Sequence, residues 1–408
     1  MMEKVLTFIM AGGKGERLWP LTKDRTKPAV PFGGIYRIID FTLSNCINSG
    51  LRQIYVLTQY KSASLQRHIR LGWNILASEL NEYIELLPAQ QRVGDMWYLG
   101  TADAIYQNLY TLELDHPTEI LILAGDHVYK MNYCSMIDFH RQAGADLTVG
   151  VVELAKAEAK HLGVVEVDSM GRVKGFEEKP ANPKTIPNQP DKVYGSMGIY
   201  VFKHEVLENE LQDDAKNRAT HHDFGKDIIP QMLKKGLKVA AFNFVDENRK
   251  DSHHWRDIGT IDAYYEANMD LVQVDPVFNL YDKNWPIRTL QEQFPPAKTV
   301  FAGEEVTGRI GLMLDSLVAG GCIISGGRVQ RSILSPNVRI NSYCQVHDSI
   351  LMEGVNVGRY AKIRRAIIDK DVVIPQGMVI GYDPIEDKKR FFVSDSGIVV
   401  VAKGTEIK

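Results

Sequence analysis

Cysteine is scarce in this chain of 408 residues, and its four cysteines stand far apart. They form no C-x-x-C pair and lie at Cys46, Cys134, Cys322 and Cys344. This spacing predicts buried free thiols rather than a disulfide framework, which fits a reducing cytoplasm.

The chain also lacks a strong net charge and a long apolar run. With a formal net charge of −3, it offers no overall attraction to nucleic acid or to a membrane surface, so anion binding must come from local clusters. No apolar run approaches the ~20 residues that span a bilayer. The first apolar stretch begins at Val5, which leaves no room for a signal peptide. The length and the hydrophobic fraction of 44% are typical of a soluble globular protein with two or three domains.

One short segment carries the clearest chemical signal. The apolar run from Val5 to Met10 predicts a buried parallel strand, and three glycines within four residues follow it closely. Glycine lets the backbone approach a ligand and point its N–H groups at an anion, and Arg17 and Lys27 add positive charge beside those amides. The segment predicts a cradle for nucleotide phosphates. Its spacing matches neither the dinucleotide fingerprint nor the Walker P-loop.

Short apolar runs alternate with helical stretches through about residue 250. We expect strands at Val5–Met10, Gln53–Thr58, Ile120–Leu123, Leu147–Glu153, Gly198–Phe202 and Val239–Phe244. Such alternation predicts an α/β fold with a Rossmann-like, mostly parallel sheet and helices on both faces. Ligands bind beyond the carboxyl ends of these strands, where the glycine turn and Gly125-Asp126-His127 are expected to lie.

The C-terminal part has a different rhythm. Aliphatic residues recur six apart in triplets that repeat every seventeen residues, at Leu317, Ile323, Val329, Leu334, Ile340, Val346, Leu351, Val357, Ile363, Ile368, Ile374 and Ile380. A sixfold period predicts a parallel β-helix in which each coil carries three short strands and the aliphatic side chains stack inward. The less favoured alternative is an antiparallel sheet with coincidental spacing. The exposed ends of such a solenoid favour association.

Several polar residues stand where strands are expected to end. Asp126 fits a Mg²⁺ ligand and a helix-capping aspartate equally well. Taken alone, Asp257 fits a helix cap better, and Glu178-Lys179 fits a solvated turn better. Ser196 lies in an ambiguous polar turn before a strand, and Asp223 fits a helix N-cap.

In order along the chain, these motifs resemble one family. Ala11 to Lys27 resembles the signature G-G-x-G-x-R-L…K-P of the sugar-nucleotide pyrophosphorylases. Nearly the whole chain is similar to their glucose-1-phosphate adenylyltransferase (ADP-glucose pyrophosphorylase) branch, through Lys27–Val30, Phe32–Gly34, Arg37–Phe41, Leu43–Gly50, Leu87–Arg92, Gly100–Ala104, Ala124–His127, Glu178–Pro183, Ser196–Tyr200 and Asp282–Thr289.

The resemblance implies a reaction and an architecture. AMP would pass from ATP to α-D-glucose 1-phosphate by Mg²⁺-dependent in-line attack on the α-phosphorus, giving ADP-glucose and pyrophosphate for glycogen or starch synthesis. The resemblance also implies three parts of the chain: a nucleotidyltransferase domain over 1–270, a linker over 271–300 and a left-handed β-helix over 301–408. The resemblance also implies a cytoplasmic homotetramer under allosteric control.

Roles for individual residues come from the same resemblance. The catalytic residues would be Arg17, Lys27 and Asp126, and the Mg²⁺ ligands Asp126 and Asp257. ATP would contact Gly12, Gly13, Gly15, Gln90, Tyr98 and Gly100. Glucose 1-phosphate would contact Glu178, Lys179, Ser196, Asp223, Phe224 and Trp255, with its phosphate paired to Lys179.

The chain departs from its family at the expected effector site. Many members bind sugar phosphates or related metabolites between their two domains, and the candidate contacts here are Lys23, Arg25, Arg37, Lys389 and Arg390. Some bacterial members have Lys where this chain has Asp24, and His where it has Pro31. A carboxylate repels a phosphate, so we expect a different effector or a different mode of binding.

Two rival hypotheses remain. The first is a homologue that uses UTP or dTTP, but the segments Arg37–Phe41 and Leu87–Gln91 favour adenine. The second is a non-catalytic regulatory subunit on the same scaffold. The loss of Asp126 or Lys179 would mark such a subunit, and both are present.

Overall fold

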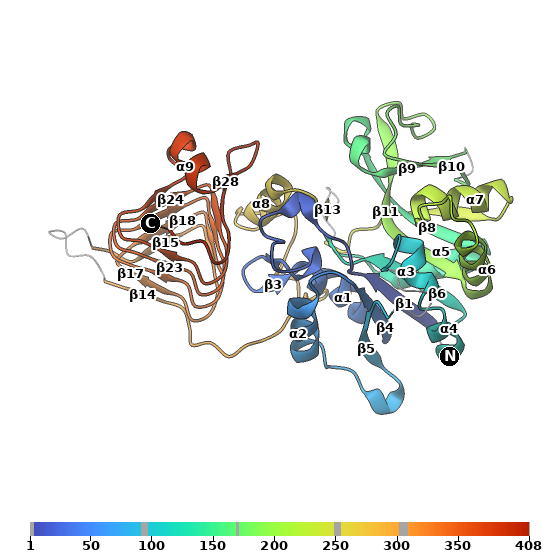
Figure 1. Cartoon of the computed structure of the whole chain (residues 1–408), viewed down its shortest axis with the longest axis horizontal. Helices are drawn as coiled ribbons and strands as arrows, with labels where there is room; N and C mark the ends of the chain where they lie inside the picture. The colour runs from blue at the N-terminus through green and yellow to red at the C-terminus, as the bar shows by residue number, and fades with distance from the viewer. Residues whose placement is uncertain (1–3, 91–96, 169–170, 249–253, 302–308, 408) are drawn as a thin grey trace.

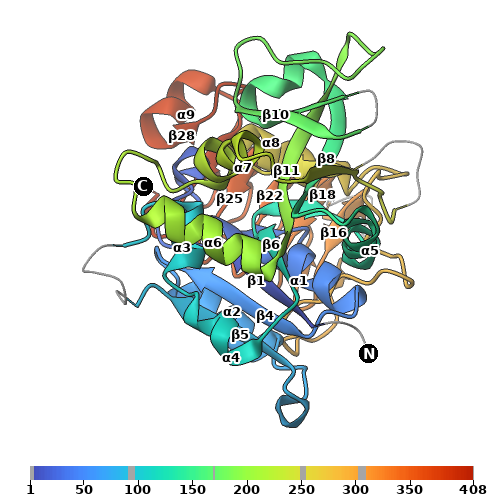
Figure 2. The same ribbon diagram turned by 90° about the vertical axis from the view of Figure 1, so that its right-hand side faces the viewer.

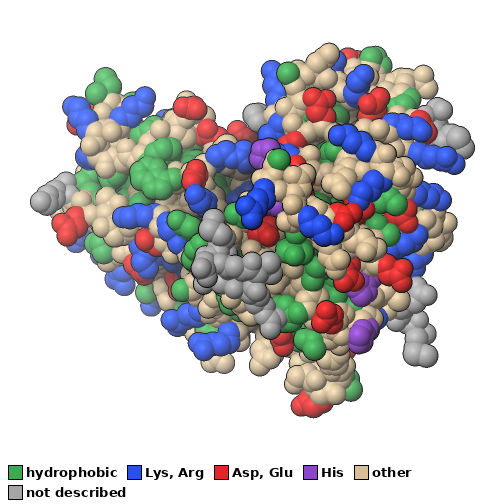
Figure 3. All heavy atoms as spheres, turned by 45° about the vertical axis from the view of Figure 1, so that its right-hand side comes forward, with side chains coloured by type: hydrophobic (Ala, Val, Ile, Leu, Met, Phe, Trp, Pro, Cys, Tyr) green, Lys and Arg blue, Asp and Glu red, His purple; other side chains and the backbone are tan. Residues whose placement is uncertain are grey.

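The computed structural model describes residues 4–90, 97–168, 171–248, 254–301 and 309–407. Figure 1 shows an α/β body formed by the N-terminal part of the chain and an all-β solenoid formed by the C-terminal part, joined by an extended segment. Among the described residues, no helix combines the length and the hydrophobicity that a bilayer span requires. Basic and acidic side chains are interspersed over the face in Figure 3, as the small net charge predicts.

Parallel strands form the centre of the α/β body. Met10 lies beside Leu57 on one side and beside Ala124 on the other, so the segments after these strands begin at one edge of the sheet. The prediction of a Rossmann-like sheet is confirmed, and two strands have the expected bounds because their apolar runs are uninterrupted. In spatial order the parallel strands are β6 (Glu119–Ala124), β1 (Val5–Met10), β4 (Gln53–Thr58) and β5 (Tyr83–Pro88).

Beyond β6 the sheet is mixed. Strand β11 (Lys192–Lys203) runs antiparallel to β6 and to its other neighbours in the sheet. It is longer than the expected Gly198–Phe202, because its register shifts between Ser196 and Tyr200 and Gly198 turns with a φ of 66°. Because of this bulge, the first half of the strand does not continue the apolar pattern of the second half. The remaining strands are β8 (Leu147–Ala155), β9 (Gly163–Val167), β10 (Val173–Glu178) and β12 (Val239–Asn243).

Helices cover both faces of the sheet, as expected. Leu6 and Phe8 of β1 pack in one core with α3, α4, α6 and α7, and Ile9 packs in the other core with α1, α2 and α5. Helices α3 and α6 stand in front of the sheet in Figure 2. The helices are α1 (Ile38–Asn48), α2 (Ala63–Gly72), α3 (Thr101–Tyr106), α4 (Tyr110–Asp115), α5 (Tyr133–Ala143), α6 (His204–Ala215), α7 (Ile229–Lys234) and α8 (Ile261–Asp270).

The solenoid is a parallel β-helix of three sheets. From Leu334 onward the predicted register of seventeen residues is confirmed, since Leu334, Leu351 and Ile368 stack in one sheet and are buried. Helix α9 (Pro384–Arg390) interrupts the coils.

The first sheet comprises β14 (Lys298–Val300), β17 (Ile323–Ser325), β20 (Arg339–Ile340), β23 (Asn356–Val357) and β26 (Val373–Ile374). The second comprises β15 (Leu312–Leu314), β18 (Arg328–Gln330), β21 (Gln345–His347), β24 (Lys362–Arg364) and β27 (Val379–Ile380), and the third β16 (Leu317–Val318), β19 (Ile333–Leu334), β22 (Ile350–Leu351), β25 (Ala366–Ile368), β29 (Val399–Val401) and β28 (Phe392–Val393).

In the first coil the predicted phase is wrong by one residue. Val318 pairs with Leu334 and Ile324 pairs with Ile340, so Val318 and Ile324 take the inward positions expected for Leu317 and Ile323. The corner after Ile324 is one residue shorter than its counterparts in later coils. Gly326 turns there with a φ of 73°, a conformation that favours glycine.

The two bodies share an apolar interface. Phe32, Phe41 and Tyr264 of the α/β body pack in one core with Ile333 and Ile350, from the third sheet of the β-helix. Strand β14 lies inside the expected linker 271–300 but already pairs with β17 of the solenoid. Leu18 and Leu21, which follow the glycine turn, belong to the same core, so this turn lies near the solenoid.

Candidate active site

The glycine turn lies at the carboxyl edge of the sheet. The Ala11 N–H donates a hydrogen bond to the carbonyl of Leu57, at a distance of 2.9 Å, which anchors the start of the turn to β4. Gly15 has a φ of 64°, and the hydroxyl of Thr22 donates to its carbonyl at 2.9 Å. A Cβ on Gly12 would lie 3.2 Å from Cβ of Gln59. The turn is therefore fixed on both sides, as a phosphate cradle requires.

Two carboxylates meet one lysine beside this turn. Lys27 Nζ lies 2.8 Å from Asp126 Oδ2 and 2.9 Å from Asp257 Oδ1. Asp126 follows β6 directly. Asp257 arrives through a short antiparallel pair, β7 (His127–Tyr129) with β13 (Trp255–Asp257), in which it stands opposite His127. Neither aspartate caps the helix that follows it, so the cluster favours a ligand role for both residues.

Burial and charge act against each other in this cluster. Burial has the largest influence on Lys27 and lowers its pKa, but the two carboxylates together raise that pKa above its ordinary value. Burial likewise raises the pKa of Asp126, yet Lys27 and His127 outweigh it and hold the pKa well below the usual range. Lys27 and Asp126 therefore form a charged pair at neutral pH.

His127 belongs to the same cluster, and sequence reasoning missed it. Its Nε2 lies 3.5 Å from Asp126 Oδ1 and 3.9 Å from Asp257 Oδ1. Its Nδ1 is buried and has no hydrogen-bond partner among the described residues. The ligand atoms of the three side chains lie within 4.8 Å of one another. Two carboxylate oxygens and an imidazole nitrogen fit a divalent cation.

Arg17 stands on the other side of Asp257. A Cβ on Gly259 would lie 3.2 Å from Asp257 Oδ2 and 3.4 Å from both terminal nitrogens of Arg17. The Arg17 side chain is exposed, so its guanidinium is open to a ligand. The structure therefore brings Arg17, Lys27, Asp126 and Asp257 together at one edge, as predicted for the catalytic and metal-binding residues.

The predicted adenosine residues flank the same edge. Gln90 is exposed just after β5, and residues 91–92 of its motif lie outside the described part of the chain. The hydroxyl of Tyr98 accepts a hydrogen bond of 3.0 Å from Asn108, and burial raises the pKa of Tyr98. A Cβ on Gly100 would lie 2.2 Å from the carbonyl oxygen of His222. Only glycine fits there, at the junction with the predicted sugar residues.

Four of the predicted sugar residues lie around Tyr200, a second residue that sequence reasoning missed. Burial raises the pKa of Tyr200, its bond with Ser196 lowers it, and the carboxylates of Asp223 and Glu178 raise it. The ring of Phe224 lies 5.5 Å from that of Tyr200. The position of Tyr200 in the family-like segment Ser196–Tyr200 was the available signal.

Asp223 and Lys179 are placed differently within this group. The Asp223 carboxylate caps the helix that starts at Phe224, accepting from the amides of Gly225 and Lys226, so its predicted N-cap role is confirmed. Lys179 is exposed, with its Nζ 3.2 Å from Glu178 Oε1. Its ammonium is thus available to an anion.

The carboxylate–histidine cluster and the predicted sugar residues adjoin each other through a glycine and a tryptophan. A Cβ on Gly198, in the bulge of β11, would lie 3.5 Å from Ala124 Cβ and 3.9 Å from His127 Cε1. The Trp255 ring meets the His127 ring edge-on, at a centroid distance of 5.1 Å. Trp255, predicted to contact the sugar, therefore lies against His127 of the carboxylate–histidine cluster.

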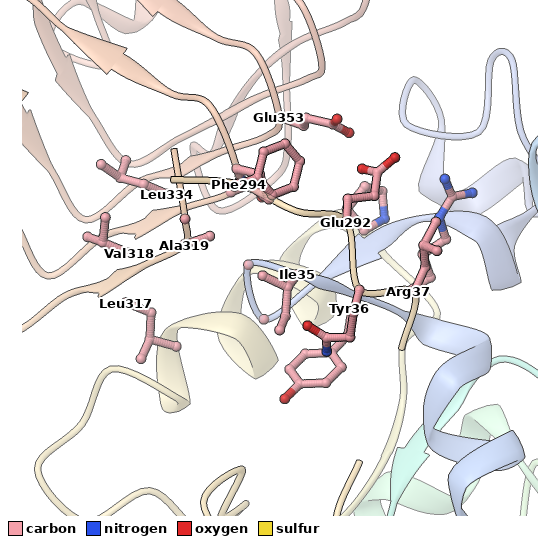
Figure 4. A pocket seen from close by; sticks show the side chains of 18 of the residues that line it. Ile35, Tyr36, Arg37, Glu292, Phe294, Leu317, Val318, Ala319, Leu334 and Glu353 are labelled. Atoms are coloured by element: carbon pink, nitrogen blue, oxygen red, sulfur yellow. The ribbon is translucent and has the colours of Figure 1, made fainter. Parts of the chain in front are cut away.

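The five predicted effector contacts are dispersed. Arg37 lines a cavity of about 470 Å³ between the hairpin at Pro31–Arg37 and the β-helix, and burial lowers its pKa. Figure 4 shows Arg37 on one side of this cavity with Glu292 and Glu353, opposite apolar residues of the solenoid. Lys23 is exposed and does not line the cavity.

The other three effector candidates are engaged elsewhere. Arg25 is buried and donates to both carboxylate oxygens of Asp369 at 2.9 Å. On α9, Lys389 pairs with Glu386 and Arg390 with Asp387. Of the five candidates, Arg37 is thus the one that lines the cavity, and the mode of effector binding stays a prediction.

Comparison with known proteins adds independent evidence. The nucleotidyl transferase model matches residues 6–274, and a GlmU-like C-terminal hexapeptide model matches residues 295–401, as the predicted left-handed β-helix requires. Glucose-1-phosphate adenylyltransferase of Koribacter versatilis is 56% identical over 404 residues, which cover 98% of this chain and 96% of that protein. The Rhodopirellula baltica enzyme of that name is 55% identical, covering 100% of this chain and 92% of its own length. Glucose-1-phosphate adenylyltransferase 2 of Vibrio cholerae is 50% identical, covering 98% of both. The chain therefore belongs to the glucose-1-phosphate adenylyltransferase family of nucleotidyl transferases.

Proposed function

We propose that this protein transfers AMP from ATP to α-D-glucose 1-phosphate, releasing pyrophosphate and forming ADP-glucose for glycogen synthesis. The observation that carries the proposal is the cluster in which Asp126 and Asp257 share one lysine beside a glycine turn. Asp126, Asp257 and His127 would hold a Mg²⁺ ion, which would supply positive charge to the phosphates of ATP.

The protein residues then have to position two polyanions. A phosphate oxygen of the sugar is itself the nucleophile, so no covalent protein intermediate is needed. The glycine turn and Arg17 would hold the phosphates of ATP, and Lys179 would hold the phosphate of the sugar. Positioning of reacting groups and electrostatic stabilisation are the main sources of catalysis in such transfers.

The sugar itself would lie against β10 and β11. The Oε2 atom of Glu178 would be 2.9 Å from a Cβ on Gly163 and 3.2 Å from one on Gly225, so these glycines leave space beside the carboxylate. A carboxylate accepts hydrogen bonds from sugar hydroxyls. Ser196 is buried beside Tyr200 and Phe224, which would form an apolar and aromatic floor.

Regulation and assembly are part of the proposal. We propose that an anionic metabolite binds at the cavity lined by Arg37, and that cytoplasmic chains assemble as a homotetramer through the α/β body and the exposed ends of the solenoid. The support for assembly is that β26 and β27 are the last strands of the first and second sheets, and that Val373 and Val379 in these strands are exposed.

The proposed function is tested by initial rates with each nucleoside triphosphate. With Mg²⁺ and glucose 1-phosphate, we expect ADP-glucose and pyrophosphate from ATP, and little product from UTP or dTTP. A preference for UTP would show that the protein has another nucleotide specificity than the one proposed. No product with any triphosphate would favour the regulatory-subunit hypothesis.

Replacement of Lys179 by Ala tests the sugar side. We expect mainly a raised KM for glucose 1-phosphate, by roughly ten- to a hundred-fold, because one charge-assisted contact with phosphate is lost. Steady-state kinetics with each substrate varied in turn measure this effect. Lys174→Ala is the matched control, since Lys174 is an exposed lysine that lies on β10, the strand just before Lys179, and pairs with Asp168. An increase confined to the KM for ATP would contradict the assignment.

A further inference from the structure

We propose that Lys27 has a second role as a stand-in for the divalent cation. In this role its ammonium bridges the two carboxylates and offsets one of their two negative charges until nucleotide phosphates draw it away, and the ion then takes its place. The inference rests on the proposed function, because it concerns the same metal-binding carboxylates. It goes further by giving the order in which cations occupy the site: Lys27 first, and the divalent ion after the nucleotide phosphates have drawn Lys27 away.

The geometry leaves room for one cation at a time. Lys27 Nζ is within hydrogen-bond distance of both carboxylates, and its side chain is only 8% exposed. The ligand atoms of Asp126, His127 and Asp257 lie within 4.8 Å of one another, and the ammonium bridges the two carboxylates among them. Mg²⁺ binds oxygen at about 2.0–2.1 Å and needs that space for itself. Occupation by Lys27 and occupation by the ion therefore exclude each other.

The charges lead to the same conclusion. Two carboxylates and one ammonium leave a single uncompensated negative charge in the cluster, which is weak attraction for a divalent ion. An ion that entered beside Lys27 would also meet the nearby guanidinium of Arg17. When the phosphates of ATP arrive, they supply several negative charges, which favour the lysine and the ion together.

Lys27 has a path to those phosphates along the glycine turn. A Cβ on Gly15 would lie 3.1 Å from Cβ of Lys27, so the stem of the lysine starts against the turn that would hold the nucleotide. A small rotation of the long side chain then exchanges carboxylates for phosphate oxygens. Metal and nucleotide consequently strengthen each other's binding, and this coupling is reciprocal.

Mn²⁺ binding without nucleotide tests this role directly, with electron paramagnetic resonance as the readout. Lys27→Met keeps an unbranched side chain that is one heavy atom shorter and removes its charge. We expect the variant to bind Mn²⁺ on the order of ten- to a hundred-fold more tightly than the wild-type protein, within the usual range of coupling between sites. Lys14→Met is the charge control, because Lys14 lies on the same turn and faces Glu16 at 4.0 Å. It should leave Mn²⁺ affinity unchanged.

Two further measurements keep the inference falsifiable. The double variant Lys27→Met/Asp126→Asn should lose the tight site, which locates the ion at this cluster. Mn²⁺ should also raise the melting temperature of Lys27→Met more than that of the wild type, because tighter binding stabilises the folded state. Equal or weaker Mn²⁺ affinity in folded Lys27→Met would overturn the stand-in role. Failure of the wild type to form ADP-glucose would instead overturn the proposed function, whatever the Mn²⁺ result.

Discussion

Replacing Asp126 with Asn is expected to lower turnover by about three powers of ten, while the affinity for glucose 1-phosphate changes little. Asn keeps the shape of the side chain but loses the negative charge that holds Lys27 at 2.8 Å and would anchor a cation. The predicted sugar residues surround Tyr200 on β11 and would stay in place. Single-turnover rates together with sugar-phosphate titrations separate the two effects.

Asp138→Asn is the matched control for this substitution. Asp138 is an exposed aspartate on α5. It lines a cavity with Lys4 and Gly50, which lie near the amino ends of β1 and β4, whereas Asp126 lies at the carboxyl edge of the sheet. We expect turnover within a factor of two of the wild type, since a surface charge far from the reacting groups has little influence. Unchanged turnover in Asp126→Asn would remove Asp126 from the mechanism.

Replacing Arg25 with Met lowers the free energy of unfolding by about 3–5 kcal/mol, because the carboxylate of Asp369 then stays buried without a counter-charge. The side chains of Arg25 and Asp369 are 7% and 2% exposed, and both carboxylate oxygens accept from one guanidinium nitrogen. The pair joins the N-terminal segment to the β-helix, so its loss should weaken the contact between the two bodies. Denaturant unfolding of the full chain measures the change.

A second substitution separates charge from packing. In Arg25→Met/Asp369→Asn the buried charge is gone, while the side-chain oxygen can still accept from the amide of Lys370. We expect this double variant to be more stable than Arg25→Met alone. Arg331→Met is the exposed counterpart, because its partner Asp348 belongs to a pair at the solenoid surface, and it should cost less than about 1 kcal/mol. A cost for Arg25→Met no larger than that would contradict the interpretation.

The parts of the fold that sequence predicts best are those with uninterrupted periodicity. Strands β1 and β4 coincide with their apolar runs because both faces of the sheet are buried there. The apolar pattern marks only the second half of strand β11, since a bulge at Gly198 breaks it. In the β-helix the stacked aliphatic positions are clear, but one shortened corner at Gly326 shifts the first coil. A local deletion changes the phase without changing the composition, so periodicity cannot detect it.

The candidate site shows a similar division. The position of Asp126 is predictable because this residue directly follows a strand with a clear apolar run. Asp257 resembles a helix cap from its neighbours, and its position depends on a pair of three-residue strands that no pattern marks. His127 and Tyr200 escape prediction as contacts because their roles depend on distances across the fold rather than on spacing along the chain. Sequence leads us to expect Lys27 only beside phosphate, and its contact with both carboxylates becomes visible in three dimensions.

The proposed function depends on one arrangement, in which Asp126 and Asp257 would anchor a cation beside the glycine turn and the basic groups that would bind the reactants. Anomalous X-ray scattering from Mn²⁺ tests it most directly, in crystals of the wild-type protein with a non-hydrolysable ATP analogue and glucose 1-phosphate. We predict an anomalous peak within coordination distance of the carboxylates of Asp126 and Asp257, with the ammonium of Lys27 turned to the phosphates. A peak bound to neither carboxylate would contradict the proposed mechanism.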